Sequence, residues 1–173
     1  PTYGDLIRET GMILSVMVPG EAVNTARKVA DALRDSGEST VYVDLNAIAP
    51  ATGREIDGVI RGAGSRYVDA SIIGGPPRPG TSTKFYASGP DVEAFQALSD
   101  YGLEVFPLGP EVGQGKGIKM VYGGALTKGL SAISTQLFMA AQEMGLYDAL
   151  EVLHEEIQGV QLDRMRRAVP NMP

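Results

Sequence analysis

The stretch MILSVMV at residues 12–18, together with the pattern that follows it, decides the class of fold. Its apolar run without a charge predicts a buried strand, which Pro19-Gly20 ends. From Glu21 to Arg34, apolar residues then recur at helical spacing on a charged background. A strand followed by an amphipathic helix is the unit that builds a parallel sheet with crossover helices.

The same alternation continues along the chain. Further strands are predicted at 40–45, 66–72, 83–88 and 104–108, and further helices at 51–61 and 91–99. The sequence therefore predicts an α/β fold in which the loops after successive strands meet at one edge of the sheet. Open α/β sheets bind their ligands at that edge.

A long apolar helix is predicted from Lys119 to Met144. Its large apolar residues are spaced by three or four, at Leu126, Leu130, Ile133, Leu137, Ala140 and Met144. Few charges lie on its other faces, so we expect it to be covered by its own chain or by a partner, and we predict a homodimer. Its polar residues make it a poor transmembrane helix. Residues 146–165 predict a charged, amphipathic helix.

The composition excludes several classes of function. A net charge of −6 argues against a nucleic-acid partner, which would need a clustered basic face. The chain has no cysteine and one histidine, His154, which excludes disulfides, thiolate metal sites and histidine metal clusters. No signal peptide or lipidation motif is visible, so we expect a cytoplasmic protein. The first residue is Pro1 rather than Met, which leaves open a start further upstream.

The segment GQGKGIKMVYG at 113–123 carries the strongest chemical signal. Its glycines allow a close backbone approach, and the N–H groups of the helix start can hold an anion such as a carboxylate. Lys119 has apolar neighbours, which would lower its pKa and suit it to general acid/base catalysis; Tyr122 and Gly123 share its helix face. The alternative is a surface lysine whose stem packs along the helix start.

Three other junctions between a strand and a loop are candidates. The segment Asp69–Gly75 ends in paired glycines whose N–H groups could bind a substrate carboxylate, although such a run is often a simple turn. Asn46 offers a donor and an acceptor at a strand end, or caps a turn. The apolar Met17–Pro19 would suit the face of a flat ring, or simply packs in the core.

In their order along the chain, these segments resemble the β-hydroxyacid dehydrogenase family, which includes 3-hydroxyisobutyrate and 6-phosphogluconate dehydrogenases. The resemblance runs from about Thr10 to Leu153 and is strongest to the subgroup with a short helical C-terminal domain. The family's substrate motif, Asp-x-x-x-x-Gly-Gly, is matched at 69–75. Its catalytic motif, Gly-x-Gly-x-x-x-Lys, is matched at 113–119.

The resemblance implies the second half of a Rossmann-type doubly wound sheet, followed by helices. Residues 1–110 would be a partial NAD(P)-binding domain that lacks the first β-α-β half, and 111–173 a truncated helical domain. The cofactor would be NADP, which is preferred, or NAD, and the substrate a small β-hydroxyacid or related carboxylate-bearing alcohol. Lys119 would be the general acid/base. The implied substrate contacts are Ser71, Gly74, Gly75, Tyr122 and Gly123, and the implied cofactor contacts are Met17, Val18, Pro19, Asn46, Gly113 and Gly115.

Departures from the family pattern keep two alternatives open. Gly123 stands where the family usually has Asn, Ile73 where it has Ser, and Asn46-Ala47 where it has Ser-Thr. No Gly-x-Gly-x-x-Gly fingerprint follows a strand near the start, so tight dinucleotide binding by this chain alone is not expected. One alternative is a noncatalytic nucleotide- or metabolite-binding module. The other is an imine-reducing relative with Tyr122 as a candidate proton donor.

Overall fold

The structure, a computed structural model, describes residues 2–76, 78 and 82–154. The chain divides into two compact units, Pro1–Ala125 and Leu126–Pro173. The first unit contains the whole sheet and the glycine–lysine segment at 113–119. That segment therefore lies with the sheet, whereas the sequence analysis assigns it to the helical region at 111–173.

The sheet has five strands, which lie side by side in chain order. The strands β1 (Met12–Ser15), β2 (Val41–Asp44) and β3 (Arg66–Ile73) are parallel. The helices α2 (Ala22–Ser36) and α3 (Pro50–Arg61) connect them as crossovers, with the short helix η1 (Pro19–Glu21) before α2. The predicted α/β class is confirmed, and the order of strands and helices follows the sequence pattern.

The direction of the last two strands differs from the expected all-parallel sheet. The strand β4 (Lys84–Ser88) is antiparallel to β3, and β5 (Glu104–Gly109) is parallel to β4. The connection from Ile73 to Lys84 is too short for a crossover helix, so the chain turns back on itself as a hairpin. Between β4 and β5 lie α4 (Val92–Gln96) and η2 (Ala97–Tyr101).

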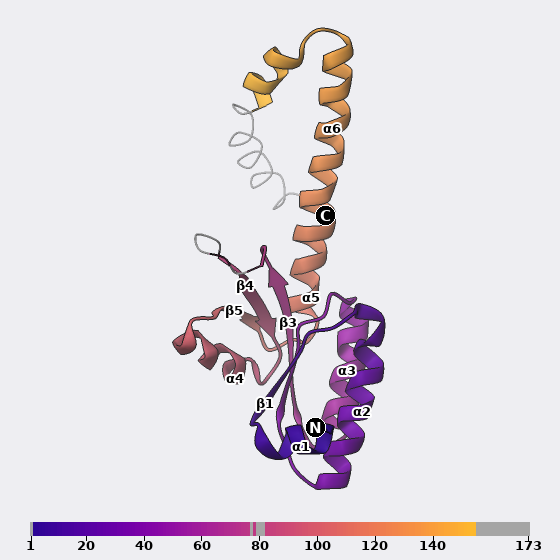
Figure 1. Cartoon of the computed structure of the whole chain (residues 1–173), viewed down its shortest axis with the longest axis vertical. Helices are drawn as coiled ribbons and strands as arrows, with labels where there is room; N and C mark the ends of the chain where they lie inside the picture. The colour runs from indigo at the N-terminus through magenta and orange to yellow at the C-terminus, as the bar shows by residue number, and fades with distance from the viewer. Residues whose placement is uncertain (1, 77, 79–81, 155–173) are drawn as a thin grey trace, which may run out of the picture. The chain divides into compact units, whose positions relative to one another are not determined.

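Helices cover both faces of the sheet (Figure 1). On the face under α2 and α3, the rings of Tyr42 and Tyr67 stack with centroids 6.4 Å apart. On the other face, Phe95 of α4 meets Phe85 edge to face at 6.0 Å. An additional helix, α1 (Tyr3–Glu9), was not expected from the sequence; it packs on α2 and begins with a capping box formed by Thr2 and Asp5.

The helix that follows the sheet begins earlier than predicted. It starts with α5 (Gln114–Lys119) rather than at Lys119, because Gly113 adopts the left-handed conformation of an N-cap with φ of 108°. A π-helical segment, η3 (Met120–Thr127), and then α6 (Lys128–Glu143) follow in the chain. π-Helical turns interrupt regular helices most often near functional sites.

In the second unit, α6 and the helical residues 147–154 make contact through aromatic rings. Phe138 packs against Tyr147 at 5.3 Å and against His154 at 5.4 Å between ring centroids. The rest of the predicted tail helix, 155–165, lies outside the described residues. Leu130, Ile133 and Leu137 of α6 are exposed. Within the described ranges, every helix is too short or too polar to cross a bilayer.

Candidate active site

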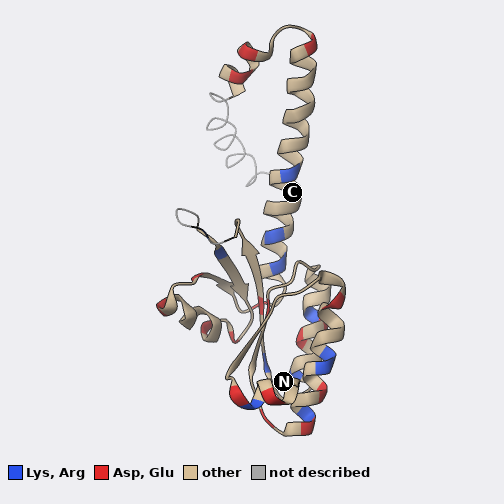
Figure 2. Cartoon of the chain, in the orientation of Figure 1, with Lys and Arg blue, Asp and Glu red and all other residues tan. Residues whose placement is uncertain are grey.

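The candidate site forms where β3 continues beyond its neighbour. The pairing of β2 with β3 ends at Asp44 and Asp69, which are register partners, while β3 runs on to Ile73. Carbonyl groups of a strand alternate between its two neighbours, so those on the β2 side beyond this point have no strand partner. The helix α5 packs over β3 here, and Figure 2 shows its positive residues in blue.

Lys119 lies at the end of β3. Its Nζ donates to the carbonyl oxygen of Ile72 at 2.8 Å, two residues before Gly74, and the side chain is half-buried. Burial lowers the pKa of Lys119 below that of an ordinary lysine, and the positive charge of Lys116 lowers it further. The ammonium group is therefore held at the carboxyl end of β3 by the carbonyl of Ile72, and its catalytic role stays a prediction.

A second lysine, which the sequence analysis did not select, is completely buried. The Nζ of Lys116 donates to the carbonyl oxygens of Asp44 at 2.7 Å and Ala70 at 2.5 Å. It also lies 3.4 Å from Asp44 Oδ1 and 3.5 Å from Asp69 Oδ1. Two signals in the sequence could have indicated it: its spacing of three residues from Lys119, and the two aspartates near the ends of adjacent predicted strands.

The anion expected at the start of α5 is supplied by the chain itself. Asp69 Oδ2 accepts the backbone N–H groups of Gly113 at 2.8 Å and Lys116 at 3.3 Å, and the hydroxyl of Ser88 at 3.1 Å. The Oγ of Ser88 in turn accepts the N–H of Gly115 at 3.0 Å. The N–H groups at the start of α5, which the sequence predicts to hold an anion such as a carboxylate, are therefore already bonded within the chain.

The glycines at 113 and 115 serve packing rather than ligand binding, which corrects their assignment as cofactor contacts. Both are buried. A Cβ on Gly115 would lie 2.8 Å from the carbonyl oxygen of Asp69, and one on Gly113 would lie 2.6 Å from Arg54 Nη1. At position 115 only glycine lets α5 approach the backbone of β3 this closely, and at position 113 the φ of 108° favours glycine.

Asn46 also differs from its expected role. It is buried, and its Nδ2 donates to Ser15 Oγ at 3.1 Å and to Asp44 Oδ1 at 2.8 Å. Its Oδ1 accepts the backbone N–H of Met17 at 2.7 Å. The amide is thus used within the protein, and Asn46 fixes the loop after β1 instead of presenting its side chain to a ligand.

The loop after β1, at Met17–Pro19, presents an apolar surface. Val18 is 71% exposed and Pro19 is exposed, while Met17 is partly buried. Val18 is therefore not part of the hydrophobic core, which was the alternative interpretation of this run. A short exposed apolar stretch at the carboxyl edge of a parallel strand is compatible with contact to a flat ring.

The predicted substrate loop is only partly available to a ligand. The hydroxyl of Ser71 is completely buried and makes no hydrogen bond to any residue that the structure describes, so its assignment as a substrate contact is corrected. Gly74 and Gly75 are exposed. The φ of Gly74 is 123°, and a Cβ there would lie 2.9 Å from the carbonyl oxygen of Ser82, so the hairpin itself requires this glycine.

Two cavities lie near the end of β3. The first, of about 620 Å³, is lined by the glycine pair together with Ile72, Pro76, Ser82, Thr83, Phe85, Gly102, Leu103 and Glu104. The second, of about 230 Å³, is lined by Ile73, Lys84, Tyr86, Ile118 and Tyr122. Tyr122, one helical turn after Lys119, thus lines the smaller cavity together with the cationic Lys84 and the phenol of Tyr86. The glycine pair lines the larger cavity instead.

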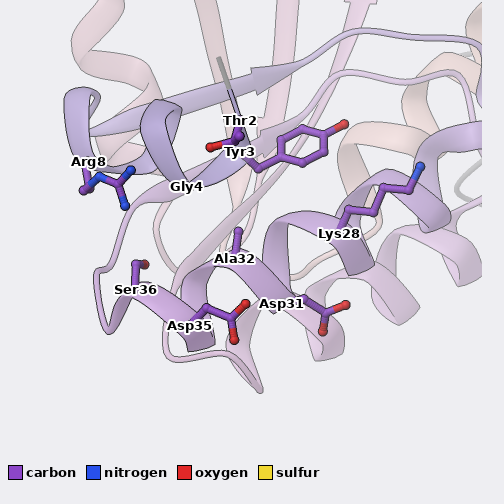
Figure 3. A pocket seen from close by; sticks show the side chains of 9 residues that line it. All are labelled: Thr2, Tyr3, Gly4, Arg8, Lys28, Asp31, Ala32, Asp35 and Ser36. Carbon is purple, nitrogen blue, oxygen red and sulfur yellow. The ribbon is translucent and has the colours of Figure 1, made fainter.

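Gly123 lies in the π-helical segment, where a Cβ would meet nothing within 4 Å. A third cavity, of about 470 Å³, lies on the surface between α1 and α2 (Figure 3). Its walls include the charged residues Arg8, Lys28, Asp31 and Asp35. α1 and the end of α2 lie at the opposite end of the sheet from the carboxyl end of β3 (Figure 1), so this hollow belongs to a different part of the surface.

Comparison with known sequences gives a distant relative. No model of a known protein family matches the chain. An uncharacterized 28.5 kDa protein from the 7S RNA 5′ region of Methanothermus fervidus is 29% identical over 157 residues. The match covers 91% of this chain and 58% of the relative, so the chain spans little more than half the length of that protein.

Comparison with solved structures gives closer information on the fold. The conserved protein MTH1747, of unknown function and described as structurally similar to 3-hydroxyacid dehydrogenases, is 33% identical with a TM-score of 0.72 over 88% of this chain and 56% of its own. An imine reductase variant from Myxococcus stipitatus in complex with NAD+ is 20% identical, with a TM-score of 0.75 over 99% and 61% of the two chains. The 3-hydroxyisobutyrate dehydrogenase of Mycobacterium tuberculosis is 20% identical, with a TM-score of 0.68 over 90% and 53%.

Proposed function

Because the chain has the fold of the β-hydroxyacid dehydrogenase family, we propose that it belongs to an NAD(P)-dependent oxidoreductase in which Lys119 is the general acid/base. The observation that carries this proposal is the position of the Lys119 ammonium, 2.8 Å from the carbonyl oxygen of Ile72 at the carboxyl end of β3. Ligands of open α/β sheets bind at that edge. The substrate would be a small alcohol that bears a carboxylate.

The lowered pKa of Lys119 suits proton exchange with such an alcohol. Its neutral amine is more populated near neutral pH than that of an ordinary lysine, because burial and the charge of Lys116 disfavour the ammonium form. The neutral amine would accept the hydroxyl proton as the alcohol is oxidised. In the reverse direction, the ammonium would return that proton to the new hydroxyl oxygen.

The small cavity beside Tyr122 is our candidate for the rest of the substrate. The ammonium of Lys84 offers a partner for a carboxylate, and the phenols of Tyr86 and Tyr122 offer hydrogen-bond donors. Its volume of about 230 Å³ suits a small acid rather than a sugar phosphate or a larger ligand. Ile73 and Ile118 would contact the apolar part of the molecule.

The described residues fit one part of a nicotinamide dinucleotide. The exposed apolar loop at Met17–Pro19 fits the nicotinamide ring, which when bound would supply or accept the hydride. The N–H groups at the start of α5 do not fit the phosphates, because Asp69 and Ser88 already accept them. The chain covers 61% of the imine reductase that is bound to NAD+, so the phosphates would need residues beyond those described here.

A second candidate is an imine reductase. Tyr122 is 45% exposed and lines the cavity of about 230 Å³, where its phenol could donate a proton to an imine nitrogen. In that case Tyr122, and not Lys119, would be the essential acid. The two candidates therefore predict opposite results for two substitutions.

The test is an assay of the complete protein against small hydroxyacids and cyclic imines, with both NADH and NADPH. For a dehydrogenase, Lys119→Met should abolish turnover of the hydroxyacid while cofactor binding is retained, and Tyr122→Phe should raise KM. For an imine reductase, Tyr122→Phe should abolish turnover instead. Lys28→Met, at an exposed position on α2, is the control. Full activity of Lys119→Met on every hydroxyacid that the wild type oxidises would refute the assignment of Lys119.

A further inference from the structure

The proposed chemistry leaves the most unusual group in the molecule without a function. Lys116 is 1% exposed, and its ammonium is surrounded by two carbonyl oxygens and two carboxylates. Burying a charge is costly unless polar partners compensate for the lost hydration, and Lys116 has such partners although it lines no cavity described above. Buried ion pairs often add little net stability, because the cost of desolvating the two charges offsets their attraction.

The geometry connects Lys116 directly to Lys119. The two lysines lie three residues apart on α5, so they share one face of the helix. Their ammonium groups bind carbonyl oxygens of Ala70 and Ile72, which are two residues apart on β3. Two strand residues span about 6.6 Å, close to one turn of helix. The two lysines thus replace the strand partner that β3 loses where β2 ends.

We propose that Lys116 is a positioning residue for Lys119: its anchored side chain holds α5 against β3 in the one register that brings the second ammonium to the carbonyl of Ile72. This inference rests on the proposed function only in the role it gives Lys119. The anchor also reaches β2 through the carbonyl of Asp44, and Asp44 accepts the amide of Asn46, which holds the loop after β1. One buried side chain therefore links the ends of three strands to the proposed catalytic helix.

The charge of Lys116 has a second effect. It lowers the pKa of Lys119, although burial of Lys119 lowers that pKa more. The other titratable groups that neighbouring elements turn toward α5 are Asp44, Arg54, Tyr67, Asp69, Lys84 and Tyr86. Loss of Lys116 would both remove a nearby positive charge and loosen α5, and each change favours the protonated form of Lys119.

The experiment measures the reactivity of Lys119 directly, without any assay of turnover. The complete protein is labelled with trace acetic anhydride across a series of pH values, and the labelling of each of its lysines is read by mass spectrometry of the peptides. In the wild type, Lys119 should react at lower pH than the exposed Lys28, and Lys116 should stay unlabelled while the protein is folded. Labelling of Lys116 at the rate of Lys28 would overturn the proposal without any variant.

Lys116→Met is the principal variant, because methionine keeps an unbranched apolar stem and removes the charge. It leaves two buried carboxylates, so Lys116→Met with Asp44→Asn is the second variant; it restores the net charge of the cluster, and an amide oxygen at position 44 can still accept from Asn46. Lys28→Met is the matched control. In both test variants, labelling of Lys119 near neutral pH should fall several-fold and its profile should move to higher pH.

The outcomes separate this inference from the proposed function. If either folded variant keeps the wild-type profile of Lys119, Lys116 only contributes to stability and the proposal fails. If the profile moves while Lys119→Met retains full turnover, the positioning role of Lys116 stands and the catalytic assignment of Lys119 is lost. If the labelling profile of Lys119 moves in the Lys116 variants and Lys119→Met loses turnover, both the positioning role of Lys116 and the catalytic role of Lys119 are supported.

Discussion

Asn46 accepts the backbone N–H of Met17 at 2.7 Å through its Oδ1, and this bond fastens the loop after β1 to the end of β2. The relationship spans 29 residues of sequence and is partly buried. It makes the shape of the apolar loop depend on a single amide, because the same side chain also donates to Ser15 and Asp44.

Replacement of Asn46 by Ala should therefore destabilise the protein and disturb the loop at once. Loss of a buried amide that serves three partners should lower the free energy of unfolding by about 1–3 kcal/mol, measured by urea denaturation. For the proposed oxidoreductase, KM for the nicotinamide cofactor should rise. Asn24→Ala is the matched control, since Asn24 is exposed and its amide donates to the exposed Glu21. Equal stability of the two variants would show that Asn46 holds nothing in place.

Gly115 and Gly117 test the close approach of α5 to β3. Gly115→Ala would place a Cβ 2.8 Å from the carbonyl oxygen of Asp69, so α5 must shift; we expect a loss of about 1–3 kcal/mol in unfolding free energy. Gly117→Ala lies in the same helix with nothing within 4 Å and should gain about 0.5–1 kcal/mol from helix propensity. The contrast is measured by thermal or urea unfolding, and a tolerated Gly115→Ala would contradict the observed packing.

Tyr42 makes the stability of the sheet sensitive to alkaline pH. Burial raises its pKa from 10.0 to about 12, so the folded protein keeps a proton that the unfolded chain releases above pH 10. The stabilising contribution of the neutral phenol is complete below pH 10 and is lost as the pH rises toward 12. The free energy of unfolding should fall across this window, and Tyr42→Phe should flatten that fall.

Tyr101→Phe is the control for this measurement, because Tyr101 is 83% exposed. Its removal should leave the alkaline slope unchanged. Tyr67 is also buried and its pKa is also raised by burial, so some slope should remain in Tyr42→Phe. An identical slope in wild type and Tyr42→Phe would mean that the buried phenol does not contribute.

The predicted dimer remains a proposal, and α6 provides its test. Leu130, Ile133 and Leu137 are exposed on this helix and lie within two turns. We expect the complete protein to be a dimer by light scattering, and Ile133→Glu to shift it toward monomer because a charge in an apolar contact is costly. Gln136→Glu adds the same charge at an exposed polar position. A wild type that is monomeric at all concentrations would rule the dimer out.

The fold could be predicted where local patterns determine it. The strands at 12–18, 40–45 and 66–72 and the helices between them alternate strongly, and the resemblance to the β-hydroxyacid dehydrogenase family is confirmed by the structural comparisons. The reversed direction of β4 could not be predicted in this way, because a strand has the same pattern in either direction. The length of the glycine–proline connection was the one available signal.

The site was harder to predict, because its polar groups are used in pairs that are distant in sequence. The side chain of Lys119 lies at the end of β3, where it donates to the carbonyl of Ile72, and its predicted catalytic role stays a prediction. Lys116 looks like a surface lysine in a glycine-rich turn. Its burial depends on contacts to Ala70 and Asp44, which precede it by 46 and 72 positions in the sequence. Ser71, Asn46, Gly113 and Gly115 carry plausible ligand groups, yet each is buried or already bonded within the chain.

The position of β1 at the end of the strand order has a practical consequence. A parallel strand at a sheet margin offers a row of backbone donors and acceptors to any extended segment that can align with it. Leu14 and Val16 are also exposed at this edge, so it offers apolar surface as well as unpaired backbone groups. A recombinant protein of these 173 residues should therefore aggregate through this edge strand. A charged residue at position 14 or 16 should reduce that aggregation.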